Sequence, residues 1–138
     1  MQIGVKTLTS VENHRVFVLE SEDITRTALQ FMLHDAYETH EFSDPLRALA
    51  RAHDWPPDLL LLGPALLAVR GRTLLSELAL TLPRTRLLLV GDPAAPVIEQ
   101  ALQAGTACSV ITLPLRLEAV RAAVDAALAR TQALPPAS

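Results

Sequence analysis

Residues 15–23 read Arg-Val-Phe-Val-Leu-Glu-Ser-Glu-Asp, an apolar run that changes abruptly into an acidic one. The β-branched and aromatic side chains of residues 15–19 are typical of a short strand buried in a sheet. Ser21 favours a helix N-cap, and the acidic residues after it stabilise the positive end of a helix. The segment therefore predicts a strand, an acidic loop and a helix. We expect that helix to bury an apolar stripe of Ile24, Ala28, Phe31 and Met32.

The alternation of strand and helix patterns repeats along the chain. Apolar runs at residues 58–62 and 86–90 are typical of strands buried on both faces, whereas the strand expected at 37–42 is more polar. A fifth strand is expected at 109–112. Amphipathic helices are expected at residues 45–52, from Gly71 to residue 82, at 96–104 with Gly105 at the C-terminal cap, and at 117–130. Five strands alternating with five helices predict an α/β fold with a parallel sheet covered on both faces.

The length of 138 residues suits one domain, which we place at residues 14–130. Residues 1–13 are a polar leader and 131–138 a tail or linker. The net charge of −3 is spread along the chain, with no basic run dense enough for nucleic acid. The longest apolar run, residues 59–69, contains Gly and Pro and is shorter than the ~20 residues that span a bilayer, so no membrane segment is expected. The single cysteine and the absence of a secretion-signal pattern favour the cytoplasm.

Three stretches carry a resemblance to a known family: residues 15–23, Pro-Asp-Leu-Leu-Leu-Leu-Gly at 57–63, and Ala-Leu-Gln-Ala-Gly at 101–105. With the order of elements, they make residues 15–130 similar to the receiver domain of bacterial two-component response regulators. The resemblance implies a CheY-like, flavodoxin-like (βα)5 three-layer sandwich with a five-stranded parallel sheet in the order 2-1-3-4-5. It also implies a role in phosphorelay signal transduction and a cis peptide bond between Leu113 and Pro114.

Active receivers carry two acids after the first strand, a phosphate-accepting Asp after the third, a Ser or Thr after the fourth and a Lys after the fifth. Clustered carboxylates hold Mg²⁺, the acceptor attacks phosphorus, and the Lys and hydroxyl stabilise the transferred group. By the resemblance these positions fall on Glu20, Ser21, Gly63, Val90 and Leu113. Glycine has no nucleophile, and four of the five positions have lost their chemistry. We expect Val90 and Leu113 to pack together over the former pocket.

Other acidic residues could in principle replace the lost acceptor or bind a metal ion. Glu20, Glu22 and Asp92 fall near one edge of the sheet, where they could form a loose divalent-ion site for Mg²⁺. Apart from this alternative, no cofactor is expected. The more frequent role of an Asp beside Pro93 is to form a turn. Asp58 is the nearest acid to Gly63 along its strand, but ~16 Å of extended chain separates the two.

The leading hypothesis is therefore a non-enzymatic pseudo-receiver that acts by binding protein, such as a histidine kinase or another regulator. The alternatives are a phospho-switch with an atypical acceptor or metal site, and a flavodoxin-like binder of a small ligand. Two surfaces are candidates for interaction. One is the apolar set Leu66, Leu67 and Val69, which either covers the former pocket or binds a partner. The other, by family analogy, is a homodimer face within residues 96–130 that includes Glu99, Arg116 and Arg121.

Overall fold

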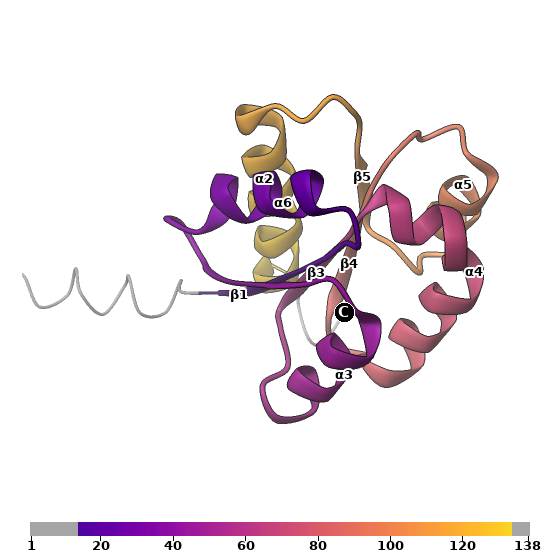
Figure 1. Cartoon of the computed structure of the whole chain (residues 1–138), viewed down its shortest axis with the longest axis horizontal. Coiled ribbons are helices and arrows are strands. Elements are labelled where there is room, and N and C mark those ends of the chain that lie inside the picture. Colours follow the sequence, from indigo (N-terminus) through magenta and orange to yellow (C-terminus); the bar gives the residue numbers. More distant parts are fainter. Residues whose placement is uncertain (1–13, 134–138) are drawn as a thin grey trace, which may run out of the picture.

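The computed structural model describes residues 14–133, in which strands and helices alternate (Figure 1). The strands are β1 (Arg15–Leu19), β2 (Glu38–Phe42), β3 (Leu59–Leu62), β4 (Arg86–Val90) and β5 (Ser109–Ile111). The helices are α2 (Asp23–Leu33), α3 (Pro45–Asp54), α4 (Pro64–Thr81), α5 (Pro96–Gln103) and α6 (Leu117–Ala133). The expected number and order of elements are confirmed. The leader at residues 1–13 and residues 134–138 lie outside the described residues.

All five strands are parallel and lie in the order β2-β1-β3-β4-β5. Strand β3 is apolar throughout and β1 is apolar after Arg15; the two lie side by side in the interior of the sheet, and the more polar β2 forms an edge. The register pairs Leu19 with Leu62 and Leu62 with Leu89. The carboxyl ends of these strands therefore form one edge of the sheet, where sites of such folds are built.

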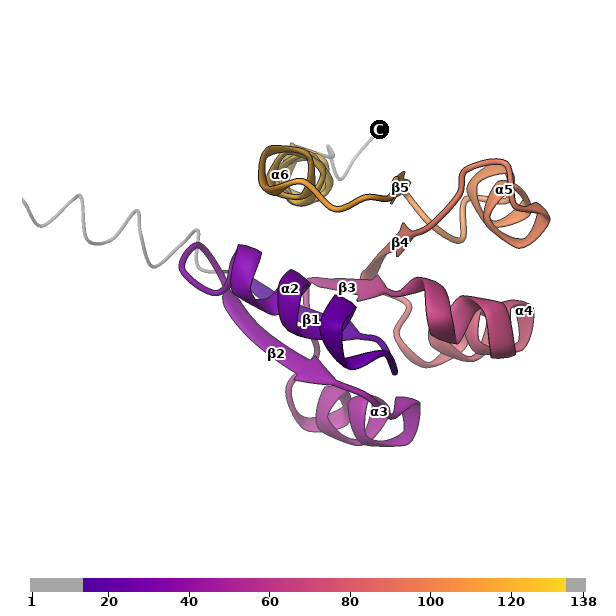
Figure 2. The same ribbon diagram turned by 45° about the horizontal axis from the view of Figure 1, so that its top comes forward.

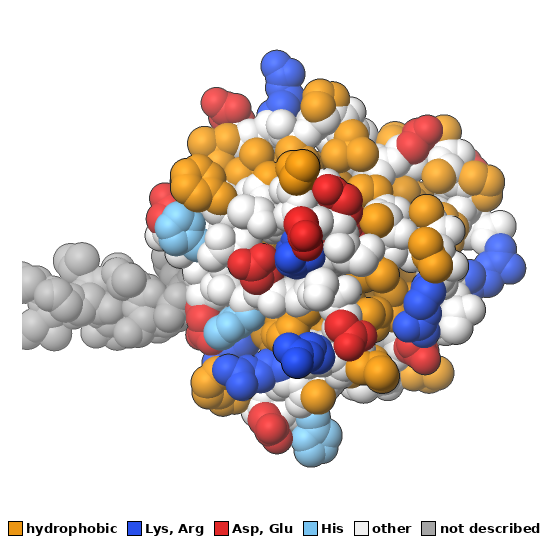
Figure 3. Space-filling model, viewed as in Figure 1, with side chains coloured by type: hydrophobic (Ala, Val, Ile, Leu, Met, Phe, Trp, Pro, Cys, Tyr) orange, Lys and Arg blue, Asp and Glu red, His pale blue; other side chains and the backbone are white. Residues whose placement is uncertain are grey.

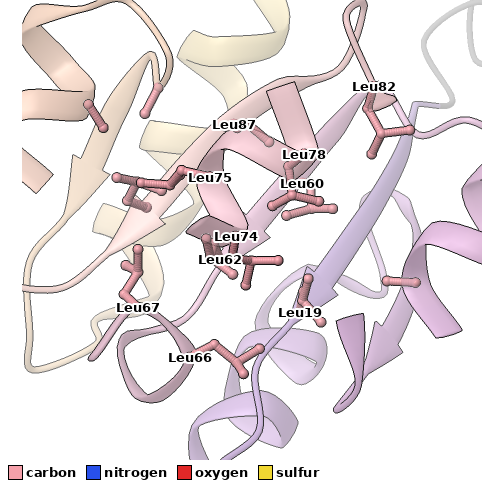
Figure 4. Packing of buried hydrophobic residues seen from close by; sticks show 14 of the residues in the cluster. Leu19, Leu60, Leu62, Leu66, Leu67, Leu74, Leu75, Leu78, Leu82 and Leu87 are labelled. Carbon is pink, nitrogen blue, oxygen red and sulfur yellow. The ribbon is translucent and has the colours of Figure 1, made fainter. Parts of the chain in front are cut away.

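Two hydrophobic clusters fill the two faces of the sheet. On one face, Phe17 and Leu19 of β1 pack against leucines of α4 and residues of α3 and α5. On the other face, Val16 and Val18 pack against α2 and α6. Figure 2 shows α6 separated by the sheet from α3 and α4. Figure 4 shows how closely leucines gather on the α4 face. The predicted three-layer sandwich is confirmed.

Helix α2 differs from its expected orientation. Its fully buried residues are Leu29 and Leu33, whereas Ile24 and Phe31 are exposed. The helix is also capped by Glu22, whose carboxylate accepts hydrogen bonds from the backbone amides of Ile24 and Thr25, and not by Ser21. The stripe prediction was therefore wrong for Ile24 and Phe31, whereas Ala28 and Met32 are partly buried and Met32 packs against the core. Arg26, on the same helix, donates from Nη1 to the carbonyl of Glu20 at 3.1 Å.

Helix α4 begins seven residues earlier than predicted, at Pro64 and not at Gly71. Proline suits the first turn of a helix, and the following Ala-Leu-Leu-Ala segment contains good helix formers. Gly71 marks a kink inside the helix, with φ 9° and ψ −97°. Helix α6 continues to Ala133, since residues 131–133 contain no helix breaker. Within residues 14–133, no helix is both long and apolar enough to cross a membrane.

Candidate functional site

Glu20 and Gly63 meet at the carboxyl edge of the sheet, because β1 and β3 are neighbours and their last residues pair. The amide of Gly63 donates to the carbonyl of Leu19 at 2.9 Å, and the amide of Glu20 donates to the carbonyl of Phe42 at 3.0 Å. The two positions that the resemblance assigns to an Mg²⁺ ligand and the phosphate acceptor are thus held side by side. Their chemistry, however, is different from that of a phosphorylation site.

The Glu20 side chain is completely buried, and in the described part of the chain no other polar or charged residue is buried. Its carboxylate lies over the first turn of α4, where Oε2 accepts from the amide of Ala65 at 3.3 Å and Oε1 from the amide of Leu66 at 3.4 Å. These bonds are long, but they satisfy amides that no carbonyl of the helix can reach. The positive end of the helix dipole also favours a negative charge there.

Gly63 is the N-cap residue of α4 and supplies no side-chain capping bond, so Glu20 provides the cap from a neighbouring strand. A Cβ atom built on Gly63 would lie 2.3 Å from Glu20 Oε1 and 2.5 Å from Glu20 Cδ. Those distances are far below van der Waals contact. The Glu20 side chain therefore occupies the space that a side chain at position 63 would need, and glycine is required here for close approach.

The other two former switch positions have separated. Val90 is completely buried in the cluster beneath α2 and α6, whereas Leu113 is half exposed. The expectation that they pack together over the pocket was wrong, because the loop after β5 carries Leu113 out to solvent. The peptide bond between Leu113 and Pro114 is cis, as the resemblance implied.

The three carboxylates considered for a metal site are each bound to backbone amides. Glu20 caps α4, Glu22 caps α2, and Asp92 accepts from the amide of Ala94 at 2.8 Å. Hydrogen bonds from Thr25 are the main cause that lowers the pKa of Glu22 below its ordinary value. Within residues 14–133, no group of three or more His, Cys, Asp and Glu side chains is placed to hold a metal ion. The structure thus does not bring the proposed ligands together.

Two further candidate residues are Ser21 and Asp58. Ser21 is exposed, and its carbonyl lies 3.5 Å from Arg26 Nη1. Asp58 lies at the opposite end of β3, where its Oδ2 accepts from the amide of Arg15 at 2.8 Å. Its carboxylate therefore cannot serve the edge at Gly63.

The apolar set after Gly63 divides between the two roles that were considered for it. Leu66 and Leu67 are buried and belong to the leucine cluster in Figure 4, whereas Val69 is 81% exposed. A hollow of about 150 Å³ lies beside this first turn, lined by Pro64, Leu67, Val90 and Asp92 among others. Leu66 and Leu67 thus help to seal the former site, and Val69 stands apart from them.

Of the three residues assigned to a homodimer face, Arg121 is placed elsewhere. Its Nη2 atom binds the carboxylate of Asp35, and its Nε donates to the carbonyl of Met32 at 3.0 Å. Arg121 therefore ties α6 to the end of α2, and the ion pair lowers the pKa of Asp35. Glu99 and Arg116 are exposed, on α5 and just before α6. The face has two of its three expected residues at the surface.

Sequence reasoning missed the capping role of Glu20 and the anchoring role of Arg26. A signal for the first was present: a helix that begins with Gly63 and Pro64 has no capping side chain of its own. For Arg26 the sequence offered only the i, i+3 pairing with Asp23 on the same helix, at 2.8 Å, whereas its contacts with the carbonyl of Glu20 and the carboxylate of Glu41 depend on the fold.

The chain has the CheY-like receiver fold, as the strand order and the solved structures similar to it show. A signal receiver domain of an HD domain-containing protein from Pseudomonas fluorescens Pf-5 matches with a TM-score of 0.76 and 23% identity, over 88% of this chain and 90% of that one. The chemotaxis response regulator CheY4 of Vibrio cholerae matches with a TM-score of 0.72 and 18% identity, over 84% and 99%.

A third similar structure is NtrX from Brucella abortus, determined in complex with ADP. It matches with a TM-score of 0.77 and 23% identity, over 87% of this chain and 27% of that one. No family model matches the sequence, and no curated protein matches it. The similarity therefore lies in the fold, while the side chains at the carboxyl edge are this chain's own.

Proposed function

We propose that this chain is a pseudo-receiver, a protein-interaction module of two-component signalling that works without phosphorylation and catalyses no reaction. The observation that carries the proposal is the Glu20 carboxylate, which is buried over Gly63 and caps α4. In a phosphorylatable receiver this space holds the acceptor and its metal. Here the Glu20 side chain lies where a side chain at position 63 would be.

Physical chemistry supports a fixed state at this edge. A buried carboxylate is costly unless it is hydrogen-bonded, and two helix amides together with the helix dipole offset that cost. Opening the site to Mg²⁺ or a phosphoryl donor would break this arrangement and would leave the helix amides without an acceptor. The partner we expect is a protein, such as a histidine kinase or another regulator, and a cytoplasmic location stays a prediction.

The proposal is tested by the intact mass of the protein under acid quench, after incubation with acetyl phosphate and Mg²⁺. We expect no gain of a phosphoryl group, while a phosphorylatable receiver treated in parallel gains one. A gain on this chain would contradict the proposal. Asp58→Asn and Asp92→Asn variants would then identify the acceptor, since the mass gain would disappear in one of them.

A second measurement addresses the metal. A titration with MgCl₂ to millimolar concentration, followed by amide chemical shifts, is expected to give no saturable change at residues 20–22, 63 or 92. A saturable change that Asp92→Asn abolishes would favour the phospho-switch alternative. Because Asp92 binds only its own turn, this variant should leave the fold intact.

A further inference from the structure

A groove lies between helices α4 and α5, on the side of the sheet that packs against the leucines of α4. One hollow of about 450 Å³ is lined by both helices, including Leu75 and Ala79 of α4 and Ala101 of α5. A second hollow of about 700 Å³ continues from it past the C-terminal ends of both helices. The two share Ala79 and Thr106 in their linings, so they form one continuous groove.

The first hollow of this α4–α5 groove has a mainly apolar lining, the second is lined by polar and apolar groups alike, and guanidinium groups lie at the rim. Arg72 lines the first hollow, and the exposed Arg84 lines the second. In the part of the chain that the structure describes, no Asp or Glu lines either hollow. The nearest acid on α4, Glu77, binds Arg70 on its own helix at 2.9 Å. The groove is thus cationic although the whole chain carries a net charge of −3.

Its geometry leaves room for large side chains of a partner. Alanines at positions 79, 101 and 104 line the groove, and small residues allow another element to approach closely. Leu80, which also lines it, is 84% exposed and adds apolar surface at its opening. Arg72 Nη2 donates to Gln100 Oε1 at 2.9 Å across the two helices, which holds the guanidinium at the rim. Figure 3 shows hydrophobic side chains gathered over α4 and α5, with basic side chains beside them.

We infer that the α4–α5 groove binds an acidic amphipathic helix of a partner protein. Leucine-like side chains of that helix fill the space above the alanines, and its carboxylates pair with the arginines at the rim. Apolar anchors in a groove provide affinity, and complementary charge provides specificity and a faster association rate. The inference rests on the proposed function, because it names the surface and the partner chemistry of the interaction module.

Most of the groove lies away from the edge that holds Glu20, although Val97 lines both its first hollow and the hollow beside the first turn of α4. Its second hollow is lined by residues 82–87 and 105–108, which lead into the amino ends of β4 and β5. Binding there needs no change at the carboxyl edge. This position explains how a chain with a sealed former phosphorylation edge could still engage a partner.

The test selects binders from a displayed library of helical 20-residue peptides in which the surface residues are randomised. We expect enriched sequences to combine leucine-like residues at helical spacing with several Asp or Glu. Amide chemical shifts of the isotope-labelled protein should then change at residues 72–80 and 97–106. Replacing the acids of a selected peptide by Lys should lower its affinity by about tenfold or more.

Two matched variants locate the binding site. Ala79 and Ala122 are both exposed alanines on helices, one in the groove and one on α6. Ala79→Glu should weaken the selected peptide by about tenfold or more, and Ala122→Glu should leave its affinity unchanged. Arg84→Glu should lower the affinity of the selected peptide, whereas Arg116→Glu, on the face expected by family analogy to form a dimer, should leave it unchanged.

The other outcomes each overturn the inference. Failure to enrich any peptide, enrichment of sequences without acids, or chemical-shift changes confined to α6 and β5 would each exclude an acidic helix in this groove. Changes confined to α6 and β5 would be compatible with the proposed interaction module but would place its binding surface on those elements. Binding of phosphatidylglycerol vesicles that Ala79→Glu abolishes would assign the groove to a lipid surface and not to a protein. A phosphoryl mass gain would contradict the proposed function while leaving the groove's result valid.

Discussion

The two ends of α4 present opposite environments. At its first turn the Glu20 carboxylate is completely buried, binds two helix amides and fills the space over Gly63. Along its last turns the same helix lines an open cationic groove beside α5. The first region is closed by charge placed inside the protein, and the second is open with charge at its rim. The comparison shows that a single helix of the receiver fold can carry a buried carboxylate at one end and an open groove at the other, and the two proposals above each rest on one of these ends.

The largest expected effect is at the closed end. Glu20→Ala should lower the free energy of unfolding by about 2–4 kcal/mol, because it leaves a void and two buried amides without an acceptor. The gain from no longer burying a carboxylate opposes this loss and is expected to be smaller, since that charge was hydrogen-bonded. Urea unfolding followed by circular dichroism measures the difference.

Glu22→Ala is the matched control for that variant, because Glu22 also caps a helix but is exposed to water. Its loss should be clearly smaller, since solvent can replace the missing acceptor. Equal losses for the two variants would mean that the burial of Glu20 contributes nothing, and the contrast between the two ends of α4 would disappear.

A second prediction concerns the close approach of Gly63 to Glu20. Gly63→Ala should cost about 1–3 kcal/mol of stability, because its Cβ would lie 2.3 Å from Glu20 Oε1. In the Glu20→Ala background the same substitution should cost much less, with a coupling energy of about 1–3 kcal/mol. Gly91→Ala serves as the control: its Cβ would meet Ile98 Cδ1, so its cost should add to that of Glu20→Ala without coupling.

A smaller, pH-dependent effect is expected at Glu22. Its pKa is lowered in the folded protein, chiefly by hydrogen bonds from Thr25. The folded value is below that of the unfolded chain, so its stabilising contribution is present above the ordinary pKa of about 4.3 and is lost as the pH falls through the folded pKa. Glu22→Gln should therefore be less stable than the original protein at pH 7 and match it near pH 2. A difference that stays constant between these pH values would exclude this role.

Much of the fold could be predicted because its signals are local. The apolar runs at residues 15–19, 59–62 and 86–90 indicate buried strands, and Gly105 marks the end of α5 with a φ of 78°. The start of α4 was misplaced because Gly71 looks like a boundary, whereas the helix passes through it with a kink. The orientation of α2 was only partly predicted, because Leu29 and Leu33 are the residues that pack against the sheet and α6, and the periodicity of one helix does not say which of two neighbouring apolar stripes will meet them.

The candidate site was only partly predictable for a related reason. Sequence alone identified that Gly63 lacks a nucleophile, since that conclusion depends on the residue type. It treated Glu20 as a surviving metal ligand, because the capping of α4 by a side chain 45 residues away depends on the distance between two strands. The α4–α5 groove gave no motif, as its lining comes from segments that only the fold brings together.

The smallest effect tests the electrostatic character of the open end. Ala79→Glu and Ala79→Lys place opposite charges at one exposed position near Arg72 and Arg84. At low salt a cationic rim should favour the Glu variant over the Lys variant by a few tenths of a kcal/mol relative to the same pair near the C-terminal end of another helix, where the helix dipole also favours Lys. The difference should vanish in about 1 M salt, where the screening length is ~3 Å. The same pair at the exposed Ala129, nearer the C-terminal end of α6, controls for helix propensity and the helix dipole, so an equal Glu-to-Lys difference at both positions would show that the groove carries no excess positive charge and would remove the electrostatic basis for an acidic partner.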